Sequence, residues 1–240
     1  MTGSAPAEQG RHEDRSFTPE ELAAGAHREQ VGGLWDTMGE LQLSFLRVHG
    51  LRPGMKLLDL GCGCLRGGVR LVAYLDPGNY FGIDSSPALL AAGYHVELVR
   101  YGLQARLPNA NLLQDENFAA RRFGVTFDMV IAQSLFSHLP WNSIRRCLAE
   151  MAVVLEPGAA FFATFFECPA ERPAAVTWIQ QPGGVTTYLD RDPYHYRLVD
   201  LAACAEGLPW RCEGLGEWGH PRGQRMARFE RLVAEPCEIR

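Results

Sequence analysis

Residues 56–68, KLLDLGCGCLRGG, decide the fold. The apolar run that opens this stretch predicts a short buried strand, and its glycines predict a sharp turn that a ligand can approach closely. A helical pattern follows from Leu65 to Leu75, and a second apolar run at 80–83 predicts a strand that ends on Asp84. A carboxylate about 20 residues beyond a glycine turn is typical of a βαβ unit that holds a ribose-bearing cofactor.

The spacing of the glycines argues against a dinucleotide. They follow the pattern Gly61-x-Gly63-x-x-x-Gly67, whereas a dinucleotide fingerprint places its third glycine one residue earlier. Asp59 lies two residues before the turn, where a carboxylate repels a pyrophosphate but suits a ligand with an ammonium group. A nicotinamide-dependent oxidoreductase on a similar βαβ unit is therefore the weaker alternative.

The run LLDLGCG at 57–63 resembles the first motif of class I S-adenosylmethionine-dependent methyltransferases. In that family the turn holds the amino-acid part of the cofactor, and an acidic residue that matches Asp84 binds the ribose hydroxyls. Leu65 stands where the family usually has a small residue. Two later stretches resemble the family in the same order: FDMV at 127–130 with the histidine-leucine pair after it, and LEPG at 155–158.

These motifs predict an α/β fold with a doubly wound, Rossmann-like sheet of seven strands and a C-terminal antiparallel hairpin. We expect a disordered tail at 1–16, an N-terminal helical lid at 17–50 and a methyltransferase domain at 51–240. An insertion at about 167–196 breaks the α/β rhythm with prolines and aromatic residues, and we interpret it as a substrate cap.

The resemblance places cofactor-binding residues at the carboxyl ends of four strands. Asp115, after the third strand, is expected to bond the adenine amino group. The full expected set is Asp59, Gly61, Cys62, Gly63, Asp84, Ser85, Asp115, Glu116 and Gln133.

Methyl transfer to a hydroxyl or a carbon acid needs a general base, and histidine suits that role near neutral pH. The candidates, in order of preference, are His195, His138 and His220, although each also fits a purely structural role. An Asn/Asp-Pro-Pro-Tyr signature is absent after 127–128, which weakens DNA and exocyclic amines as substrates. The expected substrate-binding residues are Trp35 (equally a core residue), Glu167, Tyr194, Tyr196 and Arg222.

The composition excludes several classes of protein. A hydrophobic share of 47% provides a core of normal size without disulfides or metal, and a net charge of −5 argues against nucleic acid or an anionic membrane as partner. Seven cysteines without metal-ligand spacing indicate free thiols in a reducing cytosol. No signal peptide or membrane span is found, so we expect a cytoplasmic monomer or homodimer.

The leading hypothesis is transfer of a methyl group from S-adenosylmethionine to an oxygen, nitrogen or carbon nucleophile of a small molecule, such as a secondary metabolite. A second hypothesis keeps the cofactor but not the reaction: a fold relative that only binds S-adenosylmethionine or catalyses something else. The sequence leaves both open, because fold does not determine chemistry.

Overall fold

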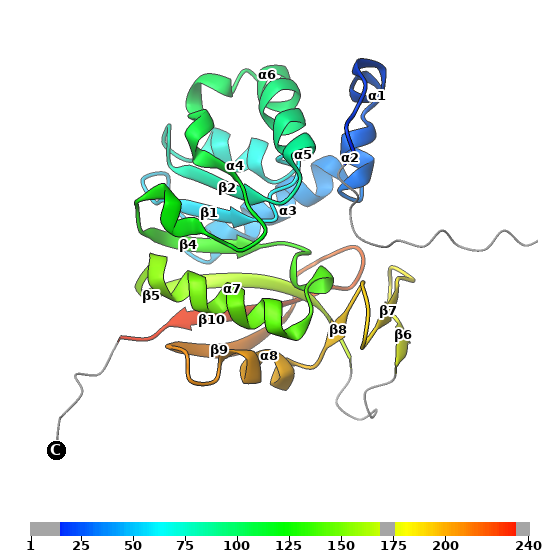
Figure 1. Ribbon diagram of the computed structural model, residues 1–240, viewed down its shortest axis with the longest axis vertical. Helices are drawn as coiled ribbons and strands as arrows, with labels where there is room; N and C mark the ends of the chain where they lie inside the picture. The colour runs from blue at the N-terminus through cyan, green and yellow to red at the C-terminus, as the bar shows by residue number, and fades with distance from the viewer. Residues whose placement is uncertain (1–14, 169–175, 234–240) are drawn as a thin grey trace, which may run out of the picture.

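The computed structural model describes residues 15–168 and 176–233 of the chain (Figure 1). Seven strands lie in the order β3-β2-β1-β4-β5-β10-β9, and a short eighth strand, β8, pairs with β5. This is the predicted doubly wound sheet with its antiparallel C-terminal hairpin. The first 14 residues of the expected tail, and part of the expected cap, lie outside the described residues.

The first five strands in this order are parallel, β10 runs antiparallel to β5, and β9 runs antiparallel to β10. The strands are β1 Leu57–Leu60, β2 Tyr80–Asp84, β3 Leu112–Gln114, β4 Phe127–Ala132, β5 Leu155–Glu167, β9 Trp210–Glu217 and β10 Arg225–Arg231.

Helices cover both faces of the sheet (Figure 1). A π-helix, Gly93–Glu97, joins α5 to α6 without a break in the backbone path. The helices are α1 Pro19–Ala24, α2 Ala26–Gln30, α3 Trp35–Val48, α4 Gly68–Tyr74, α5 Pro87–Ala92, α6 Leu98–Arg100, α7 Trp141–Val154 and α8 Leu198–Ala205.

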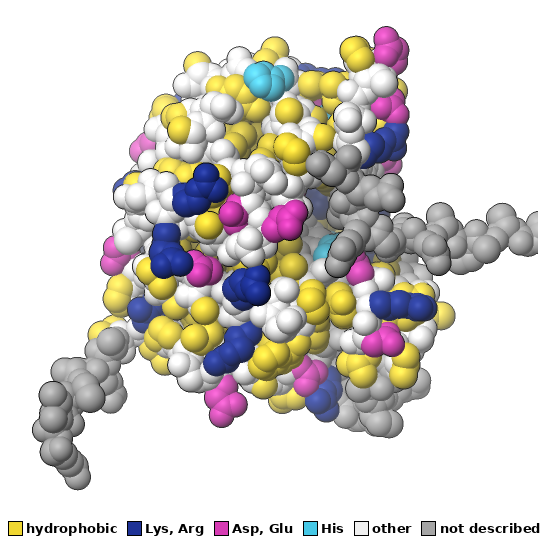
Figure 2. All heavy atoms as spheres, in the orientation of Figure 1, with side chains coloured by type: hydrophobic (Ala, Val, Ile, Leu, Met, Phe, Trp, Pro, Cys, Tyr) yellow, Lys and Arg dark blue, Asp and Glu magenta, His cyan; other side chains and the backbone are white. Residues whose placement is uncertain are grey.

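The two faces build two cores because successive side chains of a strand point to opposite sides. Leu58 and Leu60 of β1 pack on the face that α7 and α8 cover. Leu57 packs on the other face, under α3, α4 and α5. Figure 2 shows acidic and basic side chains interspersed over the face that carries α7 and α8, so no large area of one charge forms there.

The helix expected from Leu65 begins only at Gly68. Leu65 is completely buried and adopts a φ of 66°, a left-handed conformation that a helix cannot contain. The turn after β1 is therefore three residues longer than the apolar pattern suggested.

The described part of the expected cap forms a small antiparallel pair, β6 Thr177–Ile179 and β7 Thr186–Tyr188, which we call the cap hairpin. The chain then returns to the main sheet through β8, His195–Tyr196, which lies parallel to the end of β5. The carboxyl ends of the parallel strands lie on the side of the sheet that also carries the cap hairpin, α1 and α2 (Figure 1). In the described ranges, no helix is both long and apolar enough to cross a membrane.

Candidate active site

The turn after β1 is shaped by backbone that favours glycine. Gly61 has a φ of 71° and Gly63 a φ of 54°, both in the left-handed region. The Gly61 N–H donates to the Ile83 carbonyl, and the Gly63 N–H donates to Asp84 Oδ2 over 2.7 Å. The turn is thus fastened to the end of β2 at both glycines.

Asp84 is held by backbone groups on both of its oxygens. While Oδ2 accepts from Gly63, Oδ1 accepts from the N–H of Ser86, the residue that caps α5. The neighbouring Ser85 is exposed. This carboxylate therefore lies where the turn after β1 meets the start of α5.

Asp59 is buried beneath the turn. The Tyr80 hydroxyl donates to Asp59 Oδ2 over 2.8 Å. Burial raises the pKa of the Asp59 carboxyl to about 7, an effect that the Tyr80 bond and the guanidinium of Arg66 partly offset. A buried carboxylate that is costly to ionise gains much from a cationic ligand group placed against it.

Arg66 provides the opposite charge at the same turn. Its Nη1 donates to the carbonyls of Val31 and Gly33, and its Nη2 donates to Gln133 Oε1 over 2.7 Å. Burial lowers the pKa of Arg66 to about 10. Its Nε is buried and has no hydrogen-bond acceptor among the described residues, so one charged donor remains for a ligand.

Near the carboxyl ends of β4 and β5, a set of buried or half-buried side chains forms a connected hydrogen-bond network. Gln133 is its centre, since it contacts Arg66, His220 and Ser134. Ser134, two residues after the end of β4, adopts an uncommon φ of 58° for a residue other than glycine. We call the set the polar cluster: Gln42, Arg66, Gln133, Ser134, Ser137, Thr164, His220 and Gln224.

Three segments far apart in the sequence meet over the polar cluster. The turn between β9 and β10, residues 218–224, carries Arg222, whose Nη2 donates to the Gly32 carbonyl over 2.8 Å. A Cβ on Gly183, next to the cap hairpin, would lie 2.6 Å from Arg222 Cα. The segment before α3, the cap and the final turn are therefore in direct contact.

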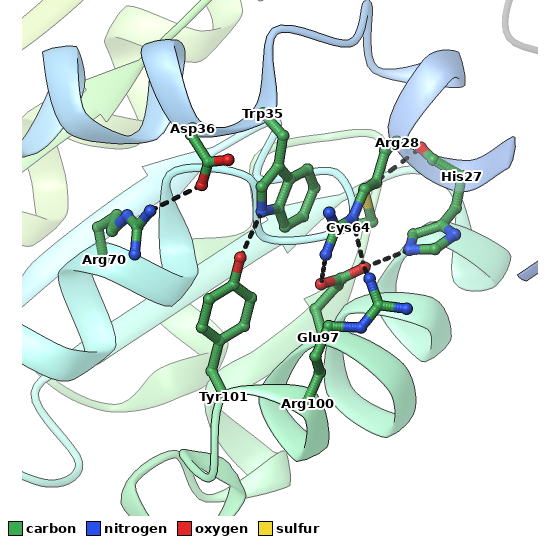
Figure 3. A network of polar contacts seen from close by, with 9 residues as sticks. All are labelled: His27, Arg28, Trp35, Asp36, Cys64, Arg70, Glu97, Arg100 and Tyr101. Carbon is green, nitrogen blue, oxygen red and sulfur yellow. Dashed lines mark hydrogen bonds and ion pairs between the residues drawn. The ribbon is translucent and has the colours of Figure 1, made fainter. Parts of the chain in front are cut away.

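A buried ion-pair network fixes the N-terminal helices to the domain (Figure 3). Glu97, from the π-helix, accepts from Arg28 on both oxygens and contacts His27 Nε2 at 2.6 Å. Trp35 donates to the Tyr101 hydroxyl, with the Arg28 guanidinium 4.2 Å from its ring centre. These contacts place Val31 directly over the glycine turn, where a Cβ on Gly63 would lie 2.8 Å from Val31 Cγ1.

Comparison with known proteins supports this geometry. Residues 58–161, which contain the turn, Asp84 and the start of the polar cluster, match the family described as "Methyltransferase domain". Over this range the chain is similar to a methyltransferase domain. S-adenosylmethionine is the cofactor of that family, so the predicted family, fold and type of cofactor are confirmed, and the oxidoreductase alternative loses its support.

Individual relatives are distant. Sterol 24-C-methyltransferase from Yarrowia lipolytica is 26% identical over 187 residues, which are 70% of this chain and 47% of that protein. The chain thus spans about half the length of this curated relative.

Among solved structures, DhpI in complex with SAH has a TM-score of 0.58 at 18% identity, covering 90% of this chain and 95% of DhpI. A methyltransferase from Clostridium acetobutylicum has a TM-score of 0.60 at 10% identity, covering 89% and 99%. Magnesium protoporphyrin IX methyltransferase from Synechocystis with bound SAM has a TM-score of 0.55 at 14% identity. The match covers 81% of this chain and 80% of that protein. At these identities the likeness establishes the fold.

The residues of the methyltransferase domain fit the cofactor. A glycine turn without side chains, a buried carboxylate at Asp59 and an unused charged donor on Arg66 suit a ligand that carries both an ammonium and a carboxylate group. Cys62 is buried in the turn, with Sγ 2.8 Å from the place of a Cβ on Gly82.

Two of the expected cofactor-binding residues, Asp115 and Glu116, lie in a loop after β3. Asp115 Oδ1 accepts from the N–H groups of Asn117 and Ala119, which shapes this loop. Glu116 follows it and is exposed. The expected contacts of Asp115 with the adenine and of Glu116 with the cofactor stay predictions.

The three histidines lie in three different surroundings. His220 belongs to the polar cluster. His138 is exposed and pairs through Nδ1 with Asp192 Oδ1 at 2.6 Å. His195 is 1% exposed, pairs with β5 and contacts Thr187 of the cap hairpin through Nδ1 at 2.9 Å.

The expected substrate-binding residues are also dispersed. Two of them contact the polar cluster through the backbone: the Arg222 N–H donates to His220 Nδ1, and the Tyr194 N–H donates to the Ser137 carbonyl. Glu167 Oε2 lies 3.6 Å from Arg225 Nε at the end of β5. Tyr194 and Tyr196 stack on one another, and the Tyr196 hydroxyl donates to the Leu139 carbonyl.

Sequence reasoning did not find Arg66, Gln42 or Gln224. The sequence does mark Arg66, because it is a charged residue within an otherwise apolar, glycine-rich connection between a strand and a helix. Such a residue could have been considered as a ligand-binding candidate. Gln42 and Gln224 carry no such signal: their neighbours in the cluster come from distant strands, and no local pattern marks them.

Proposed function

We propose that this chain transfers a methyl group from S-adenosylmethionine to a small-molecule acceptor. The observation that carries the proposal is the convergence of three charged groups, Asp59, Arg66 and Asp84, on one glycine turn within a methyltransferase domain. No feature of the charge distribution supports a nucleic-acid substrate, since the net charge is −5.

Each part of the cofactor has residues suited to it. Asp59 and the turn from Gly61 to Gly63 would hold the ammonium end, Arg66 the carboxylate, and Asp84 with Ser85 the ribose. Asp115 and Glu116 are proposed for the adenine, and Gln133 for the side of the methionine that faces β4. When bound, the cofactor supplies a methyl carbon made electrophilic by a sulfonium centre.

The acceptor is proposed to lie against the polar cluster. This cluster follows the carboxyl ends of β4 and β5, the edge at which doubly wound sheets bind their ligands. The surface hollow lined by Lys56, Arg121 and Val154 lies at the opposite edge, away from these groups.

The segments that meet over the polar cluster would exclude water and fix the direction of approach. Alignment of the reacting atoms contributes several kcal/mol to such reactions. The Gly32–Arg222 contact joins the N-terminal segment to the final turn. Closure of the N-terminal segment over the cofactor would therefore also position the acceptor. Of the three candidate histidines, we propose His220 as the one that faces the acceptor, since it belongs to the polar cluster.

Incubation with methyl-labelled S-adenosylmethionine and a small-molecule extract tests the proposal. We expect labelled products that pass a filter retaining macromolecules, and a loss of labelling in the Asp59→Asn variant. Binding of the cofactor without any labelled product would instead favour a protein that only binds S-adenosylmethionine.

A further inference from the structure

Both ring nitrogens of His220 face nitrogen donors. The backbone N–H of Arg222 donates to Nδ1 over 3.1 Å. On the other side of the ring, Nε2 lies 3.3 Å from Nε2 of Gln133. The imidazole is 8% exposed, so water reaches little of it.

The orientation of the Gln133 amide is fixed by its other contact. Arg66 Nη2 donates to Gln133 Oε1 over 2.7 Å, and a guanidinium has no acceptor that would allow the amide to turn around. The NH₂ group of Gln133 must therefore face His220, while it also donates to the Ser134 hydroxyl.

This geometry assigns the proton of the imidazole. Because Nδ1 accepts from Arg222, a neutral ring carries its hydrogen on Nε2. That N–H points at the amide nitrogen of Gln133, which is itself a donor, and therefore forms no hydrogen bond with it. A buried donor is left opposed to another donor, and a ligand oxygen that this N–H can reach would supply the missing acceptor.

The charges around the ring have one sign. Burial, together with the guanidinium groups of Arg66 and Arg222, lowers the pKa of His220 to about 4. The ring is consequently neutral at physiological pH. In the described ranges, neither Arg66 nor Arg222 forms an ion pair with a carboxylate of the protein.

We propose that the acceptor is a small organic acid, whose anionic oxygen accepts the Nε2–H of His220 between Arg66 and Arg222. This inference rests on the proposed function and names the class of its substrate. With the proton on Nε2, His220 binds the acceptor as a hydrogen-bond donor and takes no proton from it. An anion supplied in ionised form makes a general base at this position unnecessary.

Nuclear magnetic resonance on the protein labelled with ¹⁵N in its histidines tests the proposal, with benzoate as the anionic probe and benzamide as its neutral counterpart. We expect the ring of His220 to be protonated on Nε2 alone at neutral pH. Benzoate should bind at least about tenfold more tightly than benzamide, since a bond to a charged acceptor is the stronger one.

Variants separate a donor role from a structural one. His220→Ala should weaken benzoate binding by about tenfold. His220→Gln restores an N–H near the place of Nε2 and should stay within about threefold of the natural protein. His95→Ala, on the exposed surface of the π-helix, is the matched control and should leave the affinity unchanged.

A proton on Nδ1, or equal affinities for benzoate and benzamide, would overturn the proposal, as would failure of benzoate to bind. Titration of the same samples with S-adenosylhomocysteine distinguishes this failure from that of the proposed function. Cofactor binding without a preference for the anion would contradict only the proposed substrate class. Absence of cofactor binding would contradict the proposed methyltransferase function.

Discussion

Gly63 donates its backbone N–H to Asp84 Oδ2 over 2.7 Å, which joins the turn after β1 to the end of β2. The second oxygen of Asp84 accepts from Ser86. A carboxylate is an acceptor on both oxygens, and these two bonds fix the orientation of the Asp84 group. One residue thus shapes the turn and presents acceptors beside it.

Asp84→Asn should weaken the binding of S-adenosylhomocysteine by roughly tenfold or more, because the amide has one acceptor oxygen fewer and no charge. Isothermal titration calorimetry measures the change. Asp128→Asn is the control: its Oδ2 accepts from the Lys56 N–H over 2.7 Å, but at the opposite edge of the sheet. An equal loss in both variants would show that Asp84 acts only on the fold.

Asp59 should make cofactor binding depend on pH. Its pKa of about 7 means that it is protonated in the free protein below that pH, while an ammonium ligand favours the ionised form. Binding then releases a proton, and affinity should rise roughly tenfold or more from about pH 5.5 to 7.5 and level off above. Asp59→Asn should bind more weakly at every pH, without this rise. A pH-independent affinity in the natural protein would contradict the assignment.

Glu97→Gln should lower the free energy of unfolding by roughly 3 kcal/mol, because it breaks a buried ion pair and leaves His27 and Arg28 without their charge partner. Burial acts to raise the pKa of Glu97, but the bonds from Arg28 and His27 outweigh it and lower that pKa. The stabilisation is therefore present at neutral pH and lost on acidification, and the variant should lose this acid dependence.

Urea denaturation at several pH values measures both effects. Glu40→Gln is the matched control, since Glu40 is 65% exposed and lies 3.8 Å from Arg70. It should change stability by less than about 0.5 kcal/mol. Similar losses for the two variants would mean that the network in Figure 3 contributes little.

Gly63→Ala should destabilise the protein by more than Gly78→Ala. Both glycines have positive φ, 54° and 87°, but a Cβ on Gly63 would lie 2.8 Å from Val31 Cγ1, whereas nothing lies within 4 Å of a Cβ on Gly78. We expect about 1 kcal/mol from the backbone conformation at each site, with a further loss only at Gly63. Chemical denaturation of both variants measures it.

Val31→Ala in the same chain should restore part of that further loss, because it removes the methyl group nearest to the new Cβ. Independent, additive effects of the two substitutions would contradict the contact between the N-terminal segment and the turn.

The fold was predictable because its signals are local. Each buried strand is an apolar run, and α5 and α7 follow proline-containing starts that the sequence displays directly. The late start of α4 was not predictable, because Leu65 takes a left-handed conformation that tertiary packing imposes on a residue with no preference for it.

The candidate site was predictable only in its cofactor half. Asp59, Gly63 and Asp84 lie within one βαβ unit, and the unit has a recognisable spacing. The polar cluster instead joins residue 42 to residue 224, and Glu97 meets His27 across 70 positions. Such pairings follow from the path of the whole chain, which no local window contains.

A crystal structure of the protein with S-adenosylhomocysteine tests the central claim most directly. The account predicts the sulfur and amino-acid part against the turn at 61–63, with the ammonium group beside Asp59 and the ribose hydroxyls on Asp84. Ligand bound away from this turn, or a turn that stays covered by Val31 at saturating ligand, would contradict it.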